Sequence, residues 1–343
     1  MANSMITNEI KLGGYLVSKL VSLGKTSTGN EYASVRLTLQ VGVEDSQRVD
    51  VEIFANKLTS SGQVSKIYTN LMTIHEEYKS LDSQFVDRRA KKDAQPVKHE
   101  ATTVASKNEV DFVYANKGVK LSNNRYMSNG ELVTSFRLTT NFVNRAKDGV
   151  EVTPYIEGMV RGVCANDIQR VTDNNGDVVA LKLEFLVPEY REGYTNRFGE
   201  EVPSSVAVEK FELVLKELSD EAVNYCEDEF VKGRACEIGI EPMTRVEQEQ
   251  VKVEEKPKRG FGKVPTFTPS TKVTKEIRII GGFALEEDEY ENDPAFDYDA
   301  IGEGVKALEK KIEDLKENEG KAVTVAPRGF GKSNSGGGRN LPF

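Results

Sequence analysis

The chain is short of the residues that most catalytic and metal sites require. Its 343 residues include only two histidines, His75 and His99, and neither belongs to a recognisable triad or metal pattern. The three cysteines are an odd number and lack metal-ligand spacing: Cys164, Cys226 and Cys236. No spacing singles out two carboxylates for acid–base or two-metal chemistry. We therefore expect no enzyme, no metal site and no cofactor.

Long hydrophobic runs are also absent. No apolar stretch approaches the roughly 18–20 residues of a membrane-spanning helix, and residues 1–9 lack the apolar core of a signal peptide. Hydrophobic residues make up 38% of the chain and charged residues 29%, which predicts long solvated stretches around ordinary cores. These features predict a cytoplasmic protein without a membrane partner.

The net charge of −9 counts against a polyanion as partner, but the charge is unevenly distributed. Residues 286–303 carry nine acidic side chains and no basic one, whereas residues 86–99 carry five basic against two acidic. The local field decides which polymer binds where, so nucleic acid stays open as a partner. The basic stretch fits an electrostatic funnel and a plain solvated loop equally well.

Extended segments dominate the first half of the chain. Residues 32–43 alternate between apolar and polar side chains, as expected of a half-buried strand. Asn129-Gly130 between residues 119–126 and 132–143 is a strong hairpin signal. Residues 71–78 fit either a short helix or a strand, and the polar, charged stretch 82–108 predicts a long loop.

A faint second copy of this pattern begins at Tyr155. Gly14-Tyr15-Leu16-Val17 is echoed by Gly158-Met159-Val160, and Leu37–Val41 by Leu183–Val187. Ser219 is a good N-cap for a helix over 219–227, and a strand follows at 235–240. Three strands, a helix and a further strand suit a small Greek-key barrel of the OB (oligonucleotide/oligosaccharide-binding) type. We therefore predict a mainly β protein with two tandem OB-like barrels, short helices and a partly disordered C-terminal region.

This pattern divides the chain into six parts. They are an N-terminal OB-like domain 1–150 with the basic loop 82–108, a second OB-like domain 151–245 completed by a strand at 272–282, a linker 246–271, an acidic segment 283–299, a helix 300–320 and a flexible tail 321–343.

Rings and cations interleave on the predicted strands, and this combination is typical of surfaces that stack bases and neutralise phosphates. Arg36 beside Tyr32, and Arg125-Tyr126 near the hairpin tip, are the strongest individual candidates. The competing interpretation is that half of the aromatics are core and the charges only solvate a face. The complete folded set is Tyr32, Arg36, Phe54, Lys57, Tyr68, Lys120, Arg125, Tyr126, Arg137, Arg145, Tyr190, Arg191, Tyr194 and Arg197.

A five-residue word, Arg-Gly-Phe-Gly-Lys, occurs at 259–263 and again at 328–332. Phe261 and Phe330 would stack on bases while Arg259 and Arg328 meet phosphates; the alternative is a low-complexity linker. The second copy nearly completes a phosphate loop, but Ala326 stands where that motif requires glycine. We therefore expect no nucleotide site there.

Several segments resemble the large single-stranded-DNA-binding (SSB)-like proteins of bacteriophages that infect Gram-positive bacteria. They are Gly14–Val17, Ile67-Tyr68, Phe142–Arg145 and the strand Ile277–Gly282, within a likeness over residues 10–320. The ending Leu341-Pro342-Phe343 is similar to the tip of bacterial SSB tails, although Gly337–Asn340 replace the usual aspartates.

This resemblance implies binding of single-stranded DNA during phage replication or recombination in the host cytoplasm, without catalysis. Leu341, Pro342 and Phe343 would bind replication or recombination proteins, and self-association remains compatible with the pattern. Two alternatives stay open: a β-rich interaction protein that docks enzymes through its acidic segment and helix, and an RNA-binding regulator. The acidic residues 286–303 could also compete with DNA for a basic groove.

Overall fold

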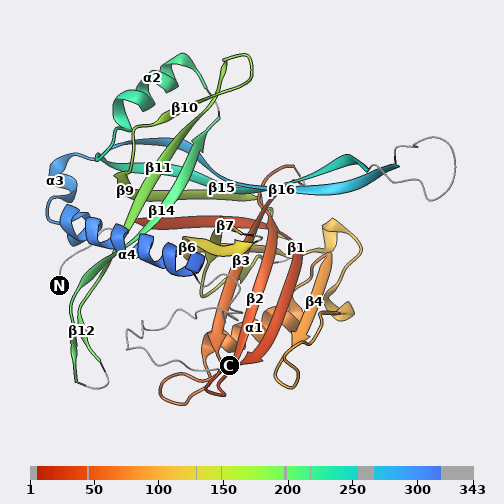
Figure 1. Cartoon of the computed structure of the whole chain (residues 1–343). Helices are drawn as coiled ribbons and strands as arrows, with labels where there is room; N and C mark the ends of the chain where they lie inside the picture. Colours follow the sequence, from red (N-terminus) through yellow and green to blue (C-terminus); the bar gives the residue numbers. More distant parts are fainter. Residues whose placement is uncertain are drawn as a thin grey trace.

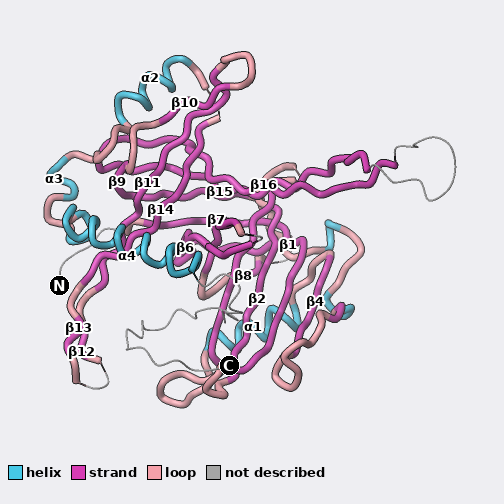
Figure 2. Tube along the Cα trace, viewed as in Figure 1, coloured by secondary structure: helices cyan, strands magenta, loops and turns pink. Residues whose placement is uncertain are grey.

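The protein is mainly β, as the sequence predicts, in a computed structural model (Figures 1 and 2). The structure describes residues 6–44, 46–128, 130–147, 149–196, 199–216, 218–253 and 266–317. Within these residues, no helix is long and apolar enough to cross a membrane.

Five strands of the first half close into a ring. Their order around the ring is β1, β2, β3, β7, β6 and back to β1, and every neighbouring pair is antiparallel except β3 with β7. Helix α1 (Lys66–Glu77) lies between β3 and β6 in the chain. The strands are β1 (Asn8–Lys25), β2 (Glu31–Gln40), β3 (Gln47–Asn56), β6 (Phe112–Ser128) and β7 (Glu131–Thr139).

Five strands of the second half close in the same order. The ring runs β9, β11, β14, β16, β15 and back to β9, and again one pair, β14 with β16, is parallel. Helix α2 (Asp220–Glu229) begins after the N-cap Ser219 and occupies the position equivalent to α1. The strands are β9 (Tyr155–Cys164), β11 (Val178–Arg191), β14 (Ser205–Leu215), β15 (Ala235–Val253) and β16 (Thr266–Ala284).

Short elements decorate the two rings. Strand β4 pairs in parallel with the end of β1 and antiparallel with β5, so part of the stretch 82–108 that we expected to be loop extends the first sheet. The short elements are β4 (Asp82–Asp87), β5 (Val97–Lys98), β8 (Asn144–Arg145), β10 (Gln169–Thr172), β12 (Tyr194–Thr195), β13 (Glu201–Val202), α3 (Glu287–Tyr290) and the 3₁₀ turns Glu100–Thr102, Lys107–Glu109 and Pro294–Phe296.

Alternation along the strands fills the rings. On β2, Val35, Leu37 and Leu39 are buried while Arg36 between them is exposed. Such a period of two places every second side chain in the core. Residues 71–78, which fit helix or strand by pattern, lie mostly in α1, because the Ser65 hydroxyl accepts from the N–H of Tyr68 and starts the helix.

Lys19 of β1 is buried and holds the end of α1. Its ammonium donates to the carbonyl oxygens of Ile74, His75 and Tyr78 at 2.7, 2.8 and 2.7 Å. These carbonyls lie at the helix C-terminus, where the backbone lacks partners and the dipole favours a cation. Burial lowers the pKa of Lys19 to about 8, and the charge of Asp111 opposes that shift.

The two rings form one hydrogen-bonded strand network. The beginning of β1 pairs with β9, and the base of β15 pairs with β3. The Arg125 guanidinium on β6 reaches β14, where it binds the Glu209 carboxylate at 2.9 Å and donates to the Lys210 carbonyl.

Strands β15 and β16 continue beyond the second ring as a two-stranded ribbon that runs away from the body (Figure 1). Residues 246–253 and 266–271 therefore belong to strands and not to the linker that we expected; residues 254–265 lie outside the described part.

The acidic segment packs on the second ring. After α3, helix α4 (Tyr298–Glu317) covers β14 and buries Ile301 and Leu308 (Figure 1). The approach is close, because a Cβ at Gly304 would lie 2.6 Å from Val208 Cγ2. A helix is thus present over the described part of the predicted range 300–320, and Ile301 and Leu308 on its apolar side are buried.

Candidate nucleic-acid interface

The outer face of β2 and β3 is polar and open. The alternation that buries Val35 and Leu37 turns Ser34 and Arg36 outward on β2, and turns Glu52 and Phe54 outward on β3. Register places Ser34 opposite Phe54 and Arg36 opposite Glu52. A ring, two charges and a hydroxyl therefore share one small area of sheet.

A groove of about 270 Å³ runs over this face. It contains three guanidinium groups and one carboxylate, so it is cationic although the whole protein is acidic. Its lining residues are Leu20, Ser22, Ser34, Val35, Arg36, Glu52, Ile53, Phe54, Arg88, Arg137, Thr139, Thr140 and Asn141.

Glu52 is shared by two of the arginines. Arg36 Nη2 lies 2.9 Å from Glu52 Oε1, and Arg137 Nη1 lies 3.5 Å from Glu52 Oε2. Among the described residues, Arg137 Nε has no hydrogen-bond partner although it is buried. One carboxylate cannot satisfy two guanidinium groups, each with five N–H donors, so the groove retains donor capacity for an anionic ligand.

Two rings lie together at the groove. Phe54 lines it, and the ring of Tyr32 lies 5.2 Å from that of Phe54 at an interplanar angle of 32°. Tyr32 rests on Gly24, where a Cβ would lie 2.4 Å from the tyrosine ring. Glycine at position 24 thus allows this ring to lie against the sheet.

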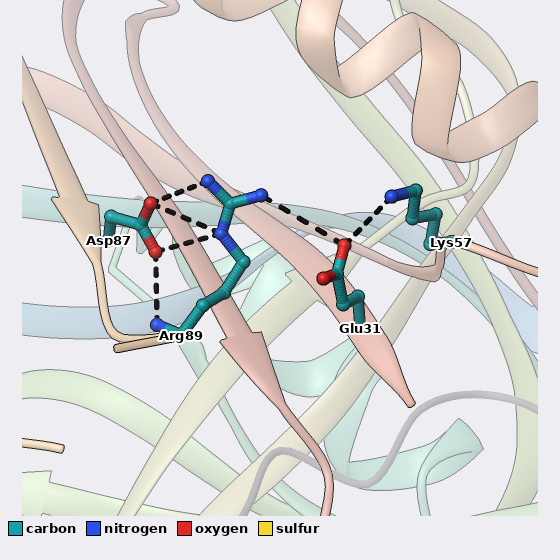
Figure 3. Close-up of polar contacts among 4 residues, drawn as sticks. All are labelled: Glu31, Lys57, Asp87 and Arg89. Carbon is teal, nitrogen blue, oxygen red and sulfur yellow. Dashed lines mark hydrogen bonds and ion pairs between the residues drawn. The ribbon is translucent and has the colours of Figure 1, made fainter. Parts of the chain in front are cut away.

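A polar network holds the chain on either side of Arg88 (Figure 3). Arg89 binds the Asp87 carboxylate at 2.5 Å and lies 3.9 Å from Glu31. The Arg88 N–H donates to the Leu23 carbonyl at 2.9 Å. Hydrogen bonds from Arg89 lower the pKa of Asp87 to about 2, so this network stays ionised at neutral pH and keeps Arg88 beside the groove.

Lys57, a predicted phosphate ligand, is neutralised in the same network. Its ammonium binds Glu31 at 2.9 Å (Figure 3). The hydrogen bond from Lys57 lowers the pKa of Glu31. Lys57 does not line the groove.

Five other predicted residues are buried or form ion pairs within the protein. Tyr68 lies on α1 and is buried in the core, and Tyr190 packs on the apolar cluster under α4. Arg125 joins the rings through Glu209, and Lys120 pairs with Glu189 across the same junction. Arg145 lies 3.6 Å from Asp111 and covers the Tyr78 ring. That these side chains meet DNA stays a prediction; in the structure, burial or a local carboxylate already engages each of them.

The remaining candidates divide into two groups. Tyr126, Arg191 and Tyr194 are exposed but do not line the groove. Arg197, Arg259, Phe261, Arg328, Phe330 and the ending Leu341, Pro342 and Phe343 lie outside the described residues, as does the near-phosphate loop.

Most of the groove residues were not predicted, and Arg88 and Ser34 are two examples. Arg88 lies in the basic stretch 86–99, where five cations in one run gave no means of choosing among them. Ser34 carries no signal beyond its place in the alternation next to Arg36.

The equivalent face of the second ring is different. Its groove is smaller, about 180 Å³, and lined by Lys182, Glu184 and Glu212 with no aromatic residue. Lys182 pairs with Glu212 at 2.9 Å, and Lys210 with Glu184 at 2.8 Å. The charges on this face therefore compensate one another.

No cluster of three or more His, Cys, Asp or Glu side chains suited to a metal occurs within the described part of the chain. The thiols of Cys164 and Cys236 lie 3.7 Å apart in the core as free cysteines. The hydrogen bond with the Cys236 thiol and burial raise the pKa of Cys164, which makes this buried thiol unreactive.

A protein-family model described as YorF matches residues 7–318. The chain belongs to the YorF family. A search of curated protein sequences finds no match.

Solved structures resembling this YorF-family chain include two of the single-stranded DNA binding protein from Thermus aquaticus. The wild type has 9% identity and a TM-score of 0.41, covering 83% of this chain and 95% of its own. A deletion mutant has 9% identity and a TM-score of 0.40, covering 84% and 98%. An SSB complex with ssDNA from Plasmodium falciparum has 12% identity and a TM-score of 0.22, covering 41% and 99%. These likenesses are too weak to define a shared fold.

Proposed function

We propose that the protein binds single-stranded DNA without sequence preference, and that the groove on the first ring is the principal site. Bases stack on Phe54 and Tyr32, while phosphates meet Arg36, Arg88 and Arg137. The observation that carries the proposal is the groove itself: a cationic, open face with paired rings on an acidic protein.

The chemistry of this face suits a single strand better than a duplex. Unstacked bases expose π-faces that fit aromatic side chains whatever the sequence, and stacking contributes about 1–3 kcal/mol per base. A duplex hides those faces and offers only phosphates. The groove carries no row of amide or carboxylate side chains that would read base edges, so we propose sequence-tolerant binding.

We further propose that both rings are OB-type barrels, in domains of about residues 1–150 and 151–284. The pairing order, the single parallel pair and the helix after the third strand support this in each half. In OB barrels the second and third strands form the ligand face, and the groove lies on those strands in the first ring. The second ring, charge-balanced and covered by α4, serves mainly as support.

The setting that the sequence resemblance implies is replication or recombination of phage DNA. In this proposal the protein covers exposed strands and performs no catalysis, and Leu341–Phe343 recruit a partner protein. A purely scaffolding role through α4 is less well supported, because Ile301 already packs in the apolar cluster on the second ring and Leu308 is also buried. The internal-competitor hypothesis for residues 286–303 also lacks support, since none of them lines the described groove.

Fluorescence anisotropy with labelled dT20, a 20-base-pair duplex and U20 RNA, at 50 and 300 mM salt, tests the proposal. We expect dT20 to bind most tightly, with affinity falling steeply as salt rises because bound phosphates release counterions. Equal binding of all three ligands, or binding of none, contradicts the proposal. Preference for U20 over dT20 favours the RNA-binding alternative.

A further inference from the structure

The ribbon of the second ring continues the sheet that carries the groove. One edge of β3 pairs with β7 at Val51 and Glu52. Nearer the beginning of β3, the same strand pairs with β15. There Thr244 lies opposite Arg48, and Arg245 lies opposite Gln47. The outer face of the first ring therefore does not end at β3, but passes onto a segment contributed by the other half of the chain.

Register decides which ribbon side chains share that face. Directly opposed residues on neighbouring strands point to the same side of a sheet. Arg48, Asp50 and Glu52 alternate along β3 and therefore share its outer face. Thr244 lies opposite Arg48 on β3 and opposite Lys275 on β16. Lys275 Nζ accordingly lies 3.9 Å from Asp50 Oδ2.

A polar atom at the centre of this area lacks a partner. Thr244 is 6% exposed, and its hydroxyl makes no hydrogen bond within the described residues. An unsatisfied buried hydroxyl costs free energy that an added acceptor would recover. With Arg48 and Lys275 on either side of Thr244 in the register, an anionic oxygen is the acceptor that fits.

We propose that the ribbon base, defined as Thr244 and Lys275, is a second contact area for the phosphate backbone of the strand held in the groove. This inference rests on the proposed function. The strand would follow the outer face of β3 from the Phe54 end to the Arg48 end, a path of roughly 20 Å at the rise of a β-strand. Among the described residues, this face carries the cations Arg36, Arg88, Arg137 and Lys275 and the carboxylates Asp50 and Glu52.

The binding site is thus built by both rings, and its length depends on their junction. A short strand can fill the groove without reaching the ribbon base, whereas a longer strand must cross it. Contacts at Thr244 and Lys275 should therefore contribute to the affinity for long strands alone.

The test compares Lys275→Gln and Thr244→Val with wild type, using labelled dT5 and dT20 in anisotropy titrations at several salt concentrations. We expect each variant to bind dT20 about 3–10-fold more weakly and dT5 unchanged, with the salt slope for Lys275→Gln reduced by about one. Lys275→Arg should restore dT20 affinity because it keeps the charge. Lys182→Gln, which removes a paired lysine on the second ring, is the matched control and should leave both ligands unaffected.

Each other outcome counts against the inference. Wild-type affinity for dT20 in both variants overturns it, and so does an equal loss for dT5 and dT20, which would mean that the ribbon base acts only by supporting the groove. A lower thermal midpoint in Lys275→Gln that Lys275→Arg does not restore also overturns it. If wild-type protein binds neither oligonucleotide, the proposed function fails as well, and the two failures are thereby distinguished.

Discussion

Arg137 lies 3.5 Å from Glu52 through one terminal nitrogen, while its buried Nε has no partner among the described residues. Arg36 takes the nearer oxygen of the same carboxylate at 2.9 Å. The single carboxylate of Glu52 therefore cannot satisfy the hydrogen-bond donors of both arginines in the groove. A phosphate oxygen would complete the guanidinium bonding that Glu52 leaves unfinished.

Glu52→Gln should strengthen DNA binding. The amide keeps the shape of the side chain but removes the one carboxylate among the described residues that line the groove, so both arginines become available to phosphate. We expect about 3–10-fold tighter binding of dT20 at low salt, with the gain shrinking as salt screens it. Stability should change by no more than about 1 kcal/mol, because these ion pairs are partly exposed. Unchanged or weaker binding in a folded variant would show that Glu52 does not oppose the ligand.

Phe54→Ala should weaken binding, because it removes a ring from the groove. A loss of one base-stacking contact corresponds to about 1–3 kcal/mol, or roughly 5–150-fold in affinity. Tyr126→Ala is the matched control, since Tyr126 is also exposed on a strand but does not line the groove. Anisotropy with dT20 should separate the two variants; equal losses would place the stacking surface elsewhere.

Arg125→Ala should lower the free energy of unfolding and leave the affinity for dT20 unchanged. The Arg125 side chain is 11% exposed and joins β6 to β14 through Glu209 and the Lys210 carbonyl. Losing this partly buried pair should cost about 2 kcal/mol in urea unfolding. Arg170→Ala, which removes an exposed ion pair with Glu227, should cost much less. A stable Arg125→Ala protein with poor dT20 affinity would reverse this assignment.

His75 should make stability depend on pH. Burial, then the nearby charges of His99 and Lys19, lower its pKa from 6.5 to about 4. Between these values the unfolded chain binds a proton that the folded protein does not, so the free energy of unfolding falls as pH decreases from 6.5 towards 4.

His75→Phe keeps a ring between Phe85 and His99 but cannot titrate. Urea unfolding at pH 7 and pH 5 should show the wild type losing about 1–2 kcal/mol more than this variant. Carboxylates common to both proteins cancel in that difference. Identical pH dependence in the two proteins would mean that His75 protonates freely in the folded state.

Local sequence patterns were sufficient to predict many of the strands, but not to predict how the strands pair into rings. The alternation over 32–43 and the Asn129-Gly130 turn depend on neighbouring residues, so they predict β2 and the β6–β7 hairpin directly. The ribbon was missed because residues 246–271 are polar, and a two-stranded ribbon away from the core needs no buried alternation. Pairing of β15 with β3 joins residues almost two hundred positions apart, which no local signal encodes.

Site residues could be predicted from the sequence where the alternation along a single strand decides which side chains point outward. Arg36 and Phe54 follow from alternation, because turning Val35 inward turns Arg36 outward. Lys57 and Arg125 look identical to ligand-binding cations in the sequence, but tertiary contacts give them Glu31 and Glu209. The fold decides which carboxylate lies beside each cation. The number of cations available to a ligand is therefore overestimated when it is inferred from composition.

The most direct test of the account is the salt dependence of dT20 binding by the double variant Arg36→Gln/Arg137→Gln, compared with Arg170→Gln. The account predicts that the double variant binds at least about tenfold more weakly at 50 mM salt, with a log–log salt slope reduced by one to two, while Arg170→Gln matches wild type. Wild-type affinity and slope in a correctly folded double variant would contradict the central claim that the first-ring groove holds the phosphates.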